Sequence, residues 1–197
     1  MVSARRKFRR RRGKRRYRKM YIIATEGAKS EPQYFDLFNS KNATIHIKCL
    51  KNRGHGRDPV KVLKELKQYI NDEGIRAGDE AWAVVDRDQW TDEQLNELHQ
   101  WRQSAENYGL AVSNPKFEYW LLLHFEEGSG VTSSRACTDR LLRYLPHYEK
   151  GHIEVDKLLL GIQSAITRAK QKDHPPCTDW PRNTGTTVYR LVEKLLS

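Results

Sequence analysis

Ala81-Trp82-Ala83-Val84-Val85-Asp86-Arg87-Asp88 is the stretch of this 197-residue chain that decides its fold. Its first five residues form an unbroken apolar run, which is typical of a strand covered on both faces in a parallel sheet. The run passes directly into two aspartates separated by one residue. In open α/β sheets, ligands bind at the carboxyl ends of the strands. We therefore predict a buried strand over 81–85 that carries Asp86 and Asp88 to a binding edge.

Two further strands and two helices are predicted on the N-terminal side of this run. Residues 20–25 form a short apolar, β-branched strand, and residues 44–50 alternate as a half-exposed strand. Between them, Ser30-Glu31-Pro32-Gln33 has the form of a capping box and predicts the start of a helix. Asp58-Pro59 opens the next helix, because apolar residues recur at helical spacing after it. Strand and helix therefore alternate up to residue 81.

The same alternation continues on the C-terminal side. Thr91-Asp92-Glu93-Gln94 is a second capping box, and its helix is expected to run to about Tyr108. Gly109 is expected to stop that helix, since glycine is the preferred residue just beyond a helix end. Residues 110–113 are apolar enough to form a fourth strand.

Beyond the fourth strand the sequence is mainly helical. Pro115 is in position to open a helix, with Asn114 as its cap. After a Gly/Ser-rich linker at 128–134, helical patterns follow near 135–145, 154–171 and 185–196.

The order of these elements predicts an α/β fold. We expect a mostly parallel central sheet of about four strands, flanked by helices. One domain is expected over residues 20–197, and it includes a helical C-terminal extension over about 134–197. Residues 1–19 are expected to form a disordered basic tail.

Composition narrows the class of protein. Hydrophobic residues make up 38% and charged residues 31%, which suits a soluble α/β protein, and no apolar run approaches the roughly 20 residues that span a bilayer. Cys49, Cys137 and Cys177 are far apart and show no CxxC spacing, which favours free thiols in a reducing compartment over a zinc site. Neither a secretory signal nor a transit peptide is recognisable. A cytoplasmic protein with no membrane partner is expected.

The net charge of +11 is concentrated in the tail. Residues 1–19 hold twelve of the 36 Lys and Arg residues and no acid, which leaves 24 bases against 25 acids in the remainder. Such an arm is expected to neutralise phosphates in a salt-dependent way, with Arg10, Arg11 and Arg12 at its centre. A solubility tag, or a charge run without a specific partner, is the alternative.

Acidic residues follow two of the predicted strands. Asp86 and Asp88 come after the strand at 81–85, and Glu26 follows the strand at 20–25. If these strands are neighbours, the three carboxylates can face one hard cation, because Mg²⁺ prefers oxygen ligands. Such a cation stabilises charge on a phosphodiester and helps to generate the nucleophile. The alternative is that these acids cap helices or solvate loops.

Four ordered motifs resemble one protein family. The motifs are Thr25-Glu26-Gly27-x-x-Ser30-Glu31-Pro32-x-Tyr34-Phe35, Val85-Asp86-x-Asp88, Asn114-Pro115-x-Phe117-Glu118-x-Trp120-Leu121-Leu122-Leu123-His124-Phe125 and Asn183-Thr184-x-Thr186-Thr187-Val188. Together they resemble the RloB-like, or AbiLii-like, family from about residue 20 to the end. The one departure is Ser30 in place of an expected Thr, and Ser caps a helix equally well.

This resemblance implies a Toprim-like fold, related to the nuclease domains of OLD-type proteins and to the catalytic domains of topoisomerases and primases. It matches Glu26 to the Toprim glutamate, and Asp86 and Asp88 to the Asp-x-Asp pair. Glu118 belongs to the family's Asn-Pro-x-Phe-Glu motif and is expected near the site. The family is associated with bacterial restriction-modification and abortive-infection loci, usually beside an ATPase partner.

Two hypotheses of function follow, with a third left open. The first is a nuclease that depends on Mg²⁺ or Mn²⁺ and cleaves DNA or RNA in anti-phage defence, with an ATPase partner. The second is a non-catalytic sensor or assembly subunit that grips nucleic acid through residues 1–19. Nucleotidyl transfer would use the same acids. The substrate polymer, the mode of cleavage, the trigger and the oligomeric state, a homo-oligomer included, stay open.

Basic residues outside the tail are candidates for contacts to nucleic acid. Lys29 precedes a predicted helix, where a phosphate is favoured. Arg53, His55 and Arg57 alternate with glycines that let the backbone approach a polyanion. Solvated side chains and a mobile surface loop are the alternatives.

The remaining prominent residues have structural interpretations that we favour. Glu31, in the first turn of a helix, is explained by the helix dipole, although it can also reach a metal site. His124 is interpreted as a hydrogen-bonded core residue in preference to a general base. Trp82, Trp101 and Trp120 are interpreted as core residues in preference to base-stacking platforms.

Overall fold

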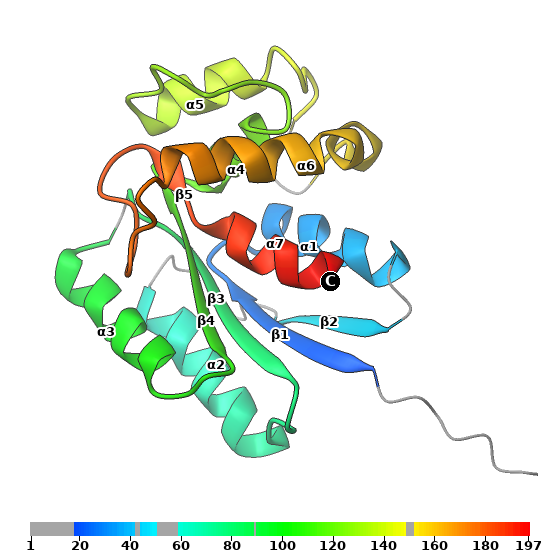
Figure 1. Cartoon of the computed structure of the whole chain (residues 1–197), viewed down its shortest axis with the longest axis vertical. Helices are drawn as coiled ribbons and strands as arrows, with labels where there is room; N and C mark the ends of the chain where they lie inside the picture. Colours follow the sequence, from blue (N-terminus) through cyan, green and yellow to red (C-terminus); the bar gives the residue numbers. More distant parts are fainter. Residues whose placement is uncertain (1–17, 42–43, 51–58, 89, 149–151) are drawn as a thin grey trace, which may run out of the picture.

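The computed structural model describes residues 18–41, 44–50, 59–88, 90–148 and 152–197, and Figure 1 shows how they are arranged. The predicted basic tail lies outside these ranges up to residue 17. Strands and helices alternate from the start. The elements are β1 (Lys19–Thr25), α1 (Ser30–Lys41), β2 (Ile45–Leu50), α2 (Pro59–Glu73), β3 (Glu80–Asp86), α3 (Asp92–Gln103), β4 (Tyr108–Asn114), α4 (Phe117–Leu122), α5 (Ser134–Leu141), α6 (Val155–Lys172), β5 (Gly185–Thr186) and α7 (Val188–Leu196).

The sheet has the strand order β2-β1-β3-β4-β5. The first four strands are parallel, and β5 runs antiparallel to β4 through the pairs Ser113 with Thr186 and Asn114 with Gly185. The predicted α/β class, with a mostly parallel sheet flanked by helices, is confirmed. The fifth strand was not predicted, because two residues are too short to show a period.

Helices cover both faces of the sheet (Figure 1). On one face, α2 and α3 pack on residues such as Ala83 and Val85, and on the other face α1 and α7 pack on residues such as Ile23 and Val84. The side chains of β1 and β3 are therefore buried on both sides, which explains the unbroken apolar run at 81–85.

The C-terminal helices share the core of the sheet. α4, α6 and α7 contribute side chains to the same hydrophobic cluster as β1. The hydroxyl oxygen of Thr187, at the start of α7, accepts a hydrogen bond from the backbone N–H of Val112 in β4 at 2.9 Å. The Tyr21 hydroxyl donates to the carbonyl of Lys194 at 3.0 Å. The predicted packing of the C-terminal helices against the α/β core is confirmed.

The predicted end of the third helix was wrong. α3 begins after Thr91, which forms the expected capping box, but it ends at Gln103, and β4 begins at Tyr108. Gly109 therefore lies inside a strand, where it is paired with Trp82 of β3. A Cβ atom at this glycine would lie 2.2 Å from the Trp82 ring. Gly109 makes room for the indole instead of stopping a helix.

The predicted start of the fourth helix was also wrong. α4 begins at Phe117, with Lys116 as its N-cap, and Pro115 precedes it after a cis peptide bond. The amide of Asn114 does not cap this helix. It donates to the carbonyl oxygens of Pro181 at 3.2 Å and Arg182 at 3.1 Å, and so ties the end of β4 to the segment before β5.

The two outermost strands of the sheet are β2 and β5. The side chain of Asn39 in α1 closes part of the β2 edge. Its Nδ2 donates to the carbonyl of Ile47 at 3.0 Å, and its Oδ1 accepts from the N–H of the same residue at 2.6 Å.

None of the helices in the described ranges combines the length and the apolar character that a membrane crossing needs.

Candidate active site

The connections of the sheet open a crevice at the carboxyl ends of β1 and β3. β1 lies between β2 and β3, and the chain leaves β1 through α1 on one face and reaches β3 through α2 on the other. Such a switch point is where α/β sheets bind ligands. The N–H of Glu26 donates to the carbonyl of Val84 at 3.1 Å, so Glu26 lies beside the end of β3. The last residue of β3 is Asp86.

A polar cavity of about 230 Å³ lies at this crevice. It contains all four side chains that the sequence predicts as catalytic, Glu26, Asp86, Asp88 and Glu118, which come from the ends of two strands and from α4. Its full lining is Glu26, Gly27, Ser30, Glu31, Asp86, Asp88, Lys116, Phe117, Glu118 and Ser134.

Glu26 is oriented by two donors. Its Oε2 accepts a hydrogen bond from Trp90 Nε1 at 2.9 Å and another from the backbone N–H of Asp86 at 3.2 Å. Trp90 is 8% exposed, so its indole is held in place by the surrounding core. Trp90 was not among the predicted site residues, because an isolated tryptophan after a strand end gives no periodic signal in the sequence.

Asp86 links the sheet to α4. Its Oδ1 accepts from the backbone N–H of Phe117 at 2.7 Å, which satisfies one of the donors that the first turn of a helix leaves unpaired. The bond also fixes the position of the next residue, Glu118, in the wall of the cavity. Asp88 is more exposed, and its Oδ2 accepts from the Ser134 hydroxyl at 2.7 Å.

Glu31 adds a fifth carboxylate to the cavity. It lies in the first turn of α1, which fits the dipole interpretation, and it is only 6% exposed. Its Oε1 accepts from the backbone N–H of Gly27 at 3.0 Å. A Cβ atom at Gly27 would lie 1.9 Å from Glu31 Oε2, so the close approach of the two residues requires glycine.

The carboxylates strongly affect the protonation of Asp86. Burial raises the pKa of Asp86 well above its usual value, and the negative charges of Glu31, Glu26, Glu118 and Asp88 raise it further. Among the described residues that line the cavity, Lys116 is the only cation. Its Nζ donates to Thr138 Oγ1 at 2.6 Å and lies 4.0 Å from Glu118 Oε1. The cavity therefore carries an excess of negative charge.

The donor atoms of the cavity suit a hard divalent cation. Carboxylate and hydroxyl oxygens are the ligands of Mg²⁺ and Mn²⁺, and the surplus of negative charge favours such an ion. In the part of the chain that the structure describes, no set of three or more His, Cys, Asp or Glu side chains is arranged to hold a metal. Glu26, Asp86 and Asp88 each accept a hydrogen bond from a protein donor on one carboxylate oxygen.

Lys29, the one described residue among the predicted contacts to nucleic acid, does not line this cavity. Lys29 is exposed and borders a shallow hollow between α1 and β2 instead. The remaining candidates lie outside the described residues, and these are Arg10, Arg11, Arg12, Arg53, His55 and Arg57.

His124 and the tryptophans are core residues, as predicted. One ring nitrogen of His124 lies 3.2 Å from the Tyr34 hydroxyl, and the other lies 3.0 Å from the Trp120 carbonyl. Burial lowers the pKa of His124 to about 4, so the ring is neutral at neutral pH. Trp82 is 5% exposed and Trp120 is fully buried, and Trp101, in α3, belongs to the hydrophobic cluster that α3 shares with α2.

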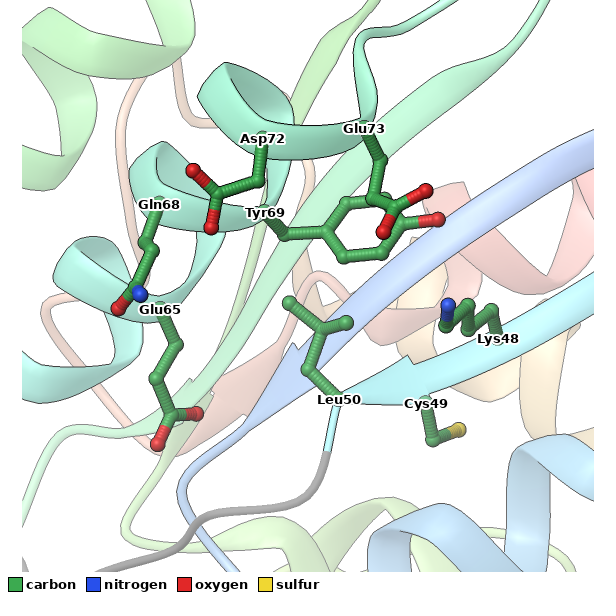
Figure 2. Close-up of a pocket in the computed structure, with 8 residues that line it drawn as sticks. All are labelled: Lys48, Cys49, Leu50, Glu65, Gln68, Tyr69, Asp72 and Glu73. Carbon is green, nitrogen blue, oxygen red and sulfur yellow. The ribbon is translucent and has the colours of Figure 1, made fainter.

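A larger hollow of about 530 Å³ lies between the end of β2 and α2 (Figure 2). Its side chains come from the end of β2, including Lys48 and Leu50, and from α2, including Tyr69 and Asp72. Lys48 Nζ lies 4.5 Å from the centre of the Tyr69 ring. None of the described residues predicted for the site lines this hollow, so volume alone does not mark the candidate active site.

Comparison with known proteins identifies a protein family that the chain matches. The model of a family described as RloB-like protein matches residues 21–195, which is nearly the whole chain. No curated protein and no solved structure matches.

Proposed function

The chain belongs to the RloB-like protein family, and we propose that it is a nuclease with a Toprim-type centre that hydrolyses phosphodiester bonds with Mg²⁺ or Mn²⁺. One observation carries the proposal. Five carboxylates, at the ends of β1 and β3 and in α1 and α4, line a single cavity in which burial and the four other acids raise the pKa of Asp86, and the one lysine of the described lining is too little to balance them. A cluster that destabilises its own charges is typical of a site built for a cation and its substrate.

Glu26, Asp86 and Asp88 would hold the ion, which supplies charge stabilisation at the phosphate and a more acidic bound water. Trp90 and the backbone of Asp86 keep Glu26 pointed at this position. The Asp88 carboxylate is exposed and accepts one side-chain hydrogen bond, from Ser134. Of the three acids, it can therefore turn toward the ion with the smallest loss of contacts.

Lys116 and Glu118 are the groups that would act on the substrate. The ammonium of Lys116 can bind a non-bridging oxygen of the scissile phosphate, since it is the cation of the described cavity lining. The Glu118 carboxylate can accept a proton from the attacking water. The polymer would then pass over the open side of the cavity, with the residues 1–19 adding salt-dependent affinity.

The partners follow from the family resemblance. We propose that the chain acts in the cytoplasm in anti-phage defence, beside an ATPase. The alternative of a non-catalytic nucleic-acid-binding subunit predicts that residues 1–19 suffice for its contribution, whereas the nuclease should keep intrinsic activity on a short substrate after their deletion, with a weaker salt dependence.

The test uses the purified full chain, alone and with its ATPase partner. Labelled single-stranded and double-stranded DNA and RNA are incubated with Mg²⁺, with Mn²⁺ and with EDTA. Cleavage that needs the metal, and that Asp86→Asn and Asp88→Asn each abolish, is the expected result. Asp72→Asn, on the exposed side of α2, is the matched control and should cleave like the wild type. Metal-independent cleavage, or none on any substrate, would contradict the proposal.

A further inference from the structure

Tyr148 contacts two lining residues of the acidic cavity and belongs to a part of the chain that carries none of the predicted catalytic residues. It follows α5, and its hydroxyl lies 3.2 Å from Ser30 Oγ and 3.2 Å from Glu118 Oε1. Ser30 begins α1, and Glu118 lies in the first turn of α4. One hydroxyl therefore contacts the first turns of two helices, α1 and α4, and both contacted residues line the cavity.

Within the described ranges, the Tyr148 hydroxyl is one of two polar side-chain groups near the Glu118 carboxylate. The structure places two polar side chains on Glu118 Oε1, Tyr148 at 3.2 Å and Lys116 at 4.0 Å. The Lys116 ammonium is already engaged by Thr138 at 2.6 Å. A hydroxyl that donates to a carboxylate fixes its direction and favours its charged form. Among the described residues, Tyr148 thus makes the shortest side-chain contact to the Glu118 carboxylate and helps to set its direction.

The environment of Tyr148 suits it to this task. Its ring is half-buried and packs against the main hydrophobic cluster, so the direction of the O–H group is set by the core. Burial and the nearby charge of Glu118 raise the pKa of Tyr148, so the hydroxyl keeps its proton and stays a donor.

We propose that Tyr148 is a positioning residue that holds the Glu118 carboxylate toward the cavity for the hydrolysis. This inference rests on the proposed function, and it adds a residue that neither the acidic motifs nor the strand ends include. It also gives the segment after α5 a part in the reaction. Because Tyr148 touches Glu118 and not the phosphate, it should affect the turnover rate more than the affinity for substrate.

The test compares Tyr148→Phe with Tyr144→Phe in the full chain. Tyr144 lies on the same segment, and its hydroxyl donates to Glu126 at 3.0 Å, outside the cavity. Both variants lose one hydroxyl and keep the ring. Since a hydrogen bond to a charged group is worth about one to two powers of ten in a rate, Tyr148→Phe should lower kcat by about tenfold or more. It should leave KM within about twofold, and Tyr144→Phe should change neither constant.

A double-mutant cycle shows whether the effect passes through Glu118. In a Glu118→Gln background, Tyr148→Phe should cause no further loss of kcat, because the carboxylate that it positions is already gone. An unchanged additional loss in that background would overturn the proposal, as would an equal loss in Tyr144→Phe.

Crystal structures of the wild type and both variants provide a readout that does not depend on activity. The Glu118 carboxylate should leave its position or become disordered in Tyr148→Phe and remain in place in Tyr144→Phe. An unmoved Glu118 in Tyr148→Phe would refute the positioning role. If the wild-type chain cleaves no nucleic acid, the proposed function fails, and the position of Glu118 in these structures still decides the role of Tyr148.

Discussion

Removing the negative charge of Asp86 should stabilise the protein while it abolishes activity. Asp86→Asn keeps the side-chain volume and the oxygen that accepts from Phe117 N–H, so the hydrogen bond at the start of α4 is retained. The change removes repulsion from four carboxylates and the burial of a charge. At a few tenths to about 1 kcal/mol for each of the four partly screened pairs, the gain is about 1–4 kcal/mol. For a chain of this size, that raises Tm by at least about 2 °C.

The gain should depend on pH. Because the folded-state pKa of Asp86 is raised, the folded protein binds this proton more tightly than the unfolded chain. The contribution of Asp86 to the free energy of unfolding of the wild type is therefore present at low pH and is lost as the pH rises through the folded-state pKa. The advantage of Asp86→Asn should be large near about pH 8 and shrink toward about pH 5.

Thermal unfolding in EDTA at both pH values measures this difference. Asp72→Asn, an exposed acid on α2, should stay within about 0.5 kcal/mol of the wild type at either pH. If Asp86→Asn is less stable than the wild type, or if its advantage is the same at both pH values, the reasoning about crowded carboxylates is refuted.

Three further changes test separate parts of the structure. Trp90→Phe removes the side-chain donor to Glu26 and leaves the backbone donor of Asp86, and initial rates should show kcat/KM reduced by about tenfold, with binding of uncleaved substrate unchanged. Gly109→Ala forces a methyl group against the Trp82 ring, and urea unfolding should show a loss of about 1–3 kcal/mol. Lys116→Gln should raise KM and reduce the salt dependence of binding, while an unchanged salt slope would count against its contact with phosphate.

Much of the fold could be predicted because its signals are local. The apolar run at 81–85 and the capping box at Thr91 depend on neighbours in sequence, and both appear in the structure. The errors occurred where distant residues decide. Gly109 stops no helix because Trp82, on the adjacent strand, needs the space above it. Asn114 caps no helix because the segment at Pro181 offers its amide two carbonyl groups.

The candidate site could be predicted in outline for a related reason. Parallel strands bring their carboxyl ends to one edge, so Glu26 and Asp86 were expected together if their strands were neighbours. That β1 and β3 are neighbours is a property of the sheet and not of either strand's sequence. The residues that orient the acids, Trp90, Ser134 and Tyr148, belong to segments whose approach to the cavity has no local pattern.

The two outer strands of the sheet limit how copies of this protein can associate. An open strand edge is a template on which another chain can add a strand and begin an aggregate. β5 offers only two residues, and on β2 the Asn39 amide already occupies both backbone groups of Ile47. Growth of the sheet from one molecule to the next is therefore obstructed at both ends. A concentrated solution of the protein should resist fibrillar association. Asn39→Leu should leave the backbone groups of Ile47 in β2 without these hydrogen bonds and open to another strand.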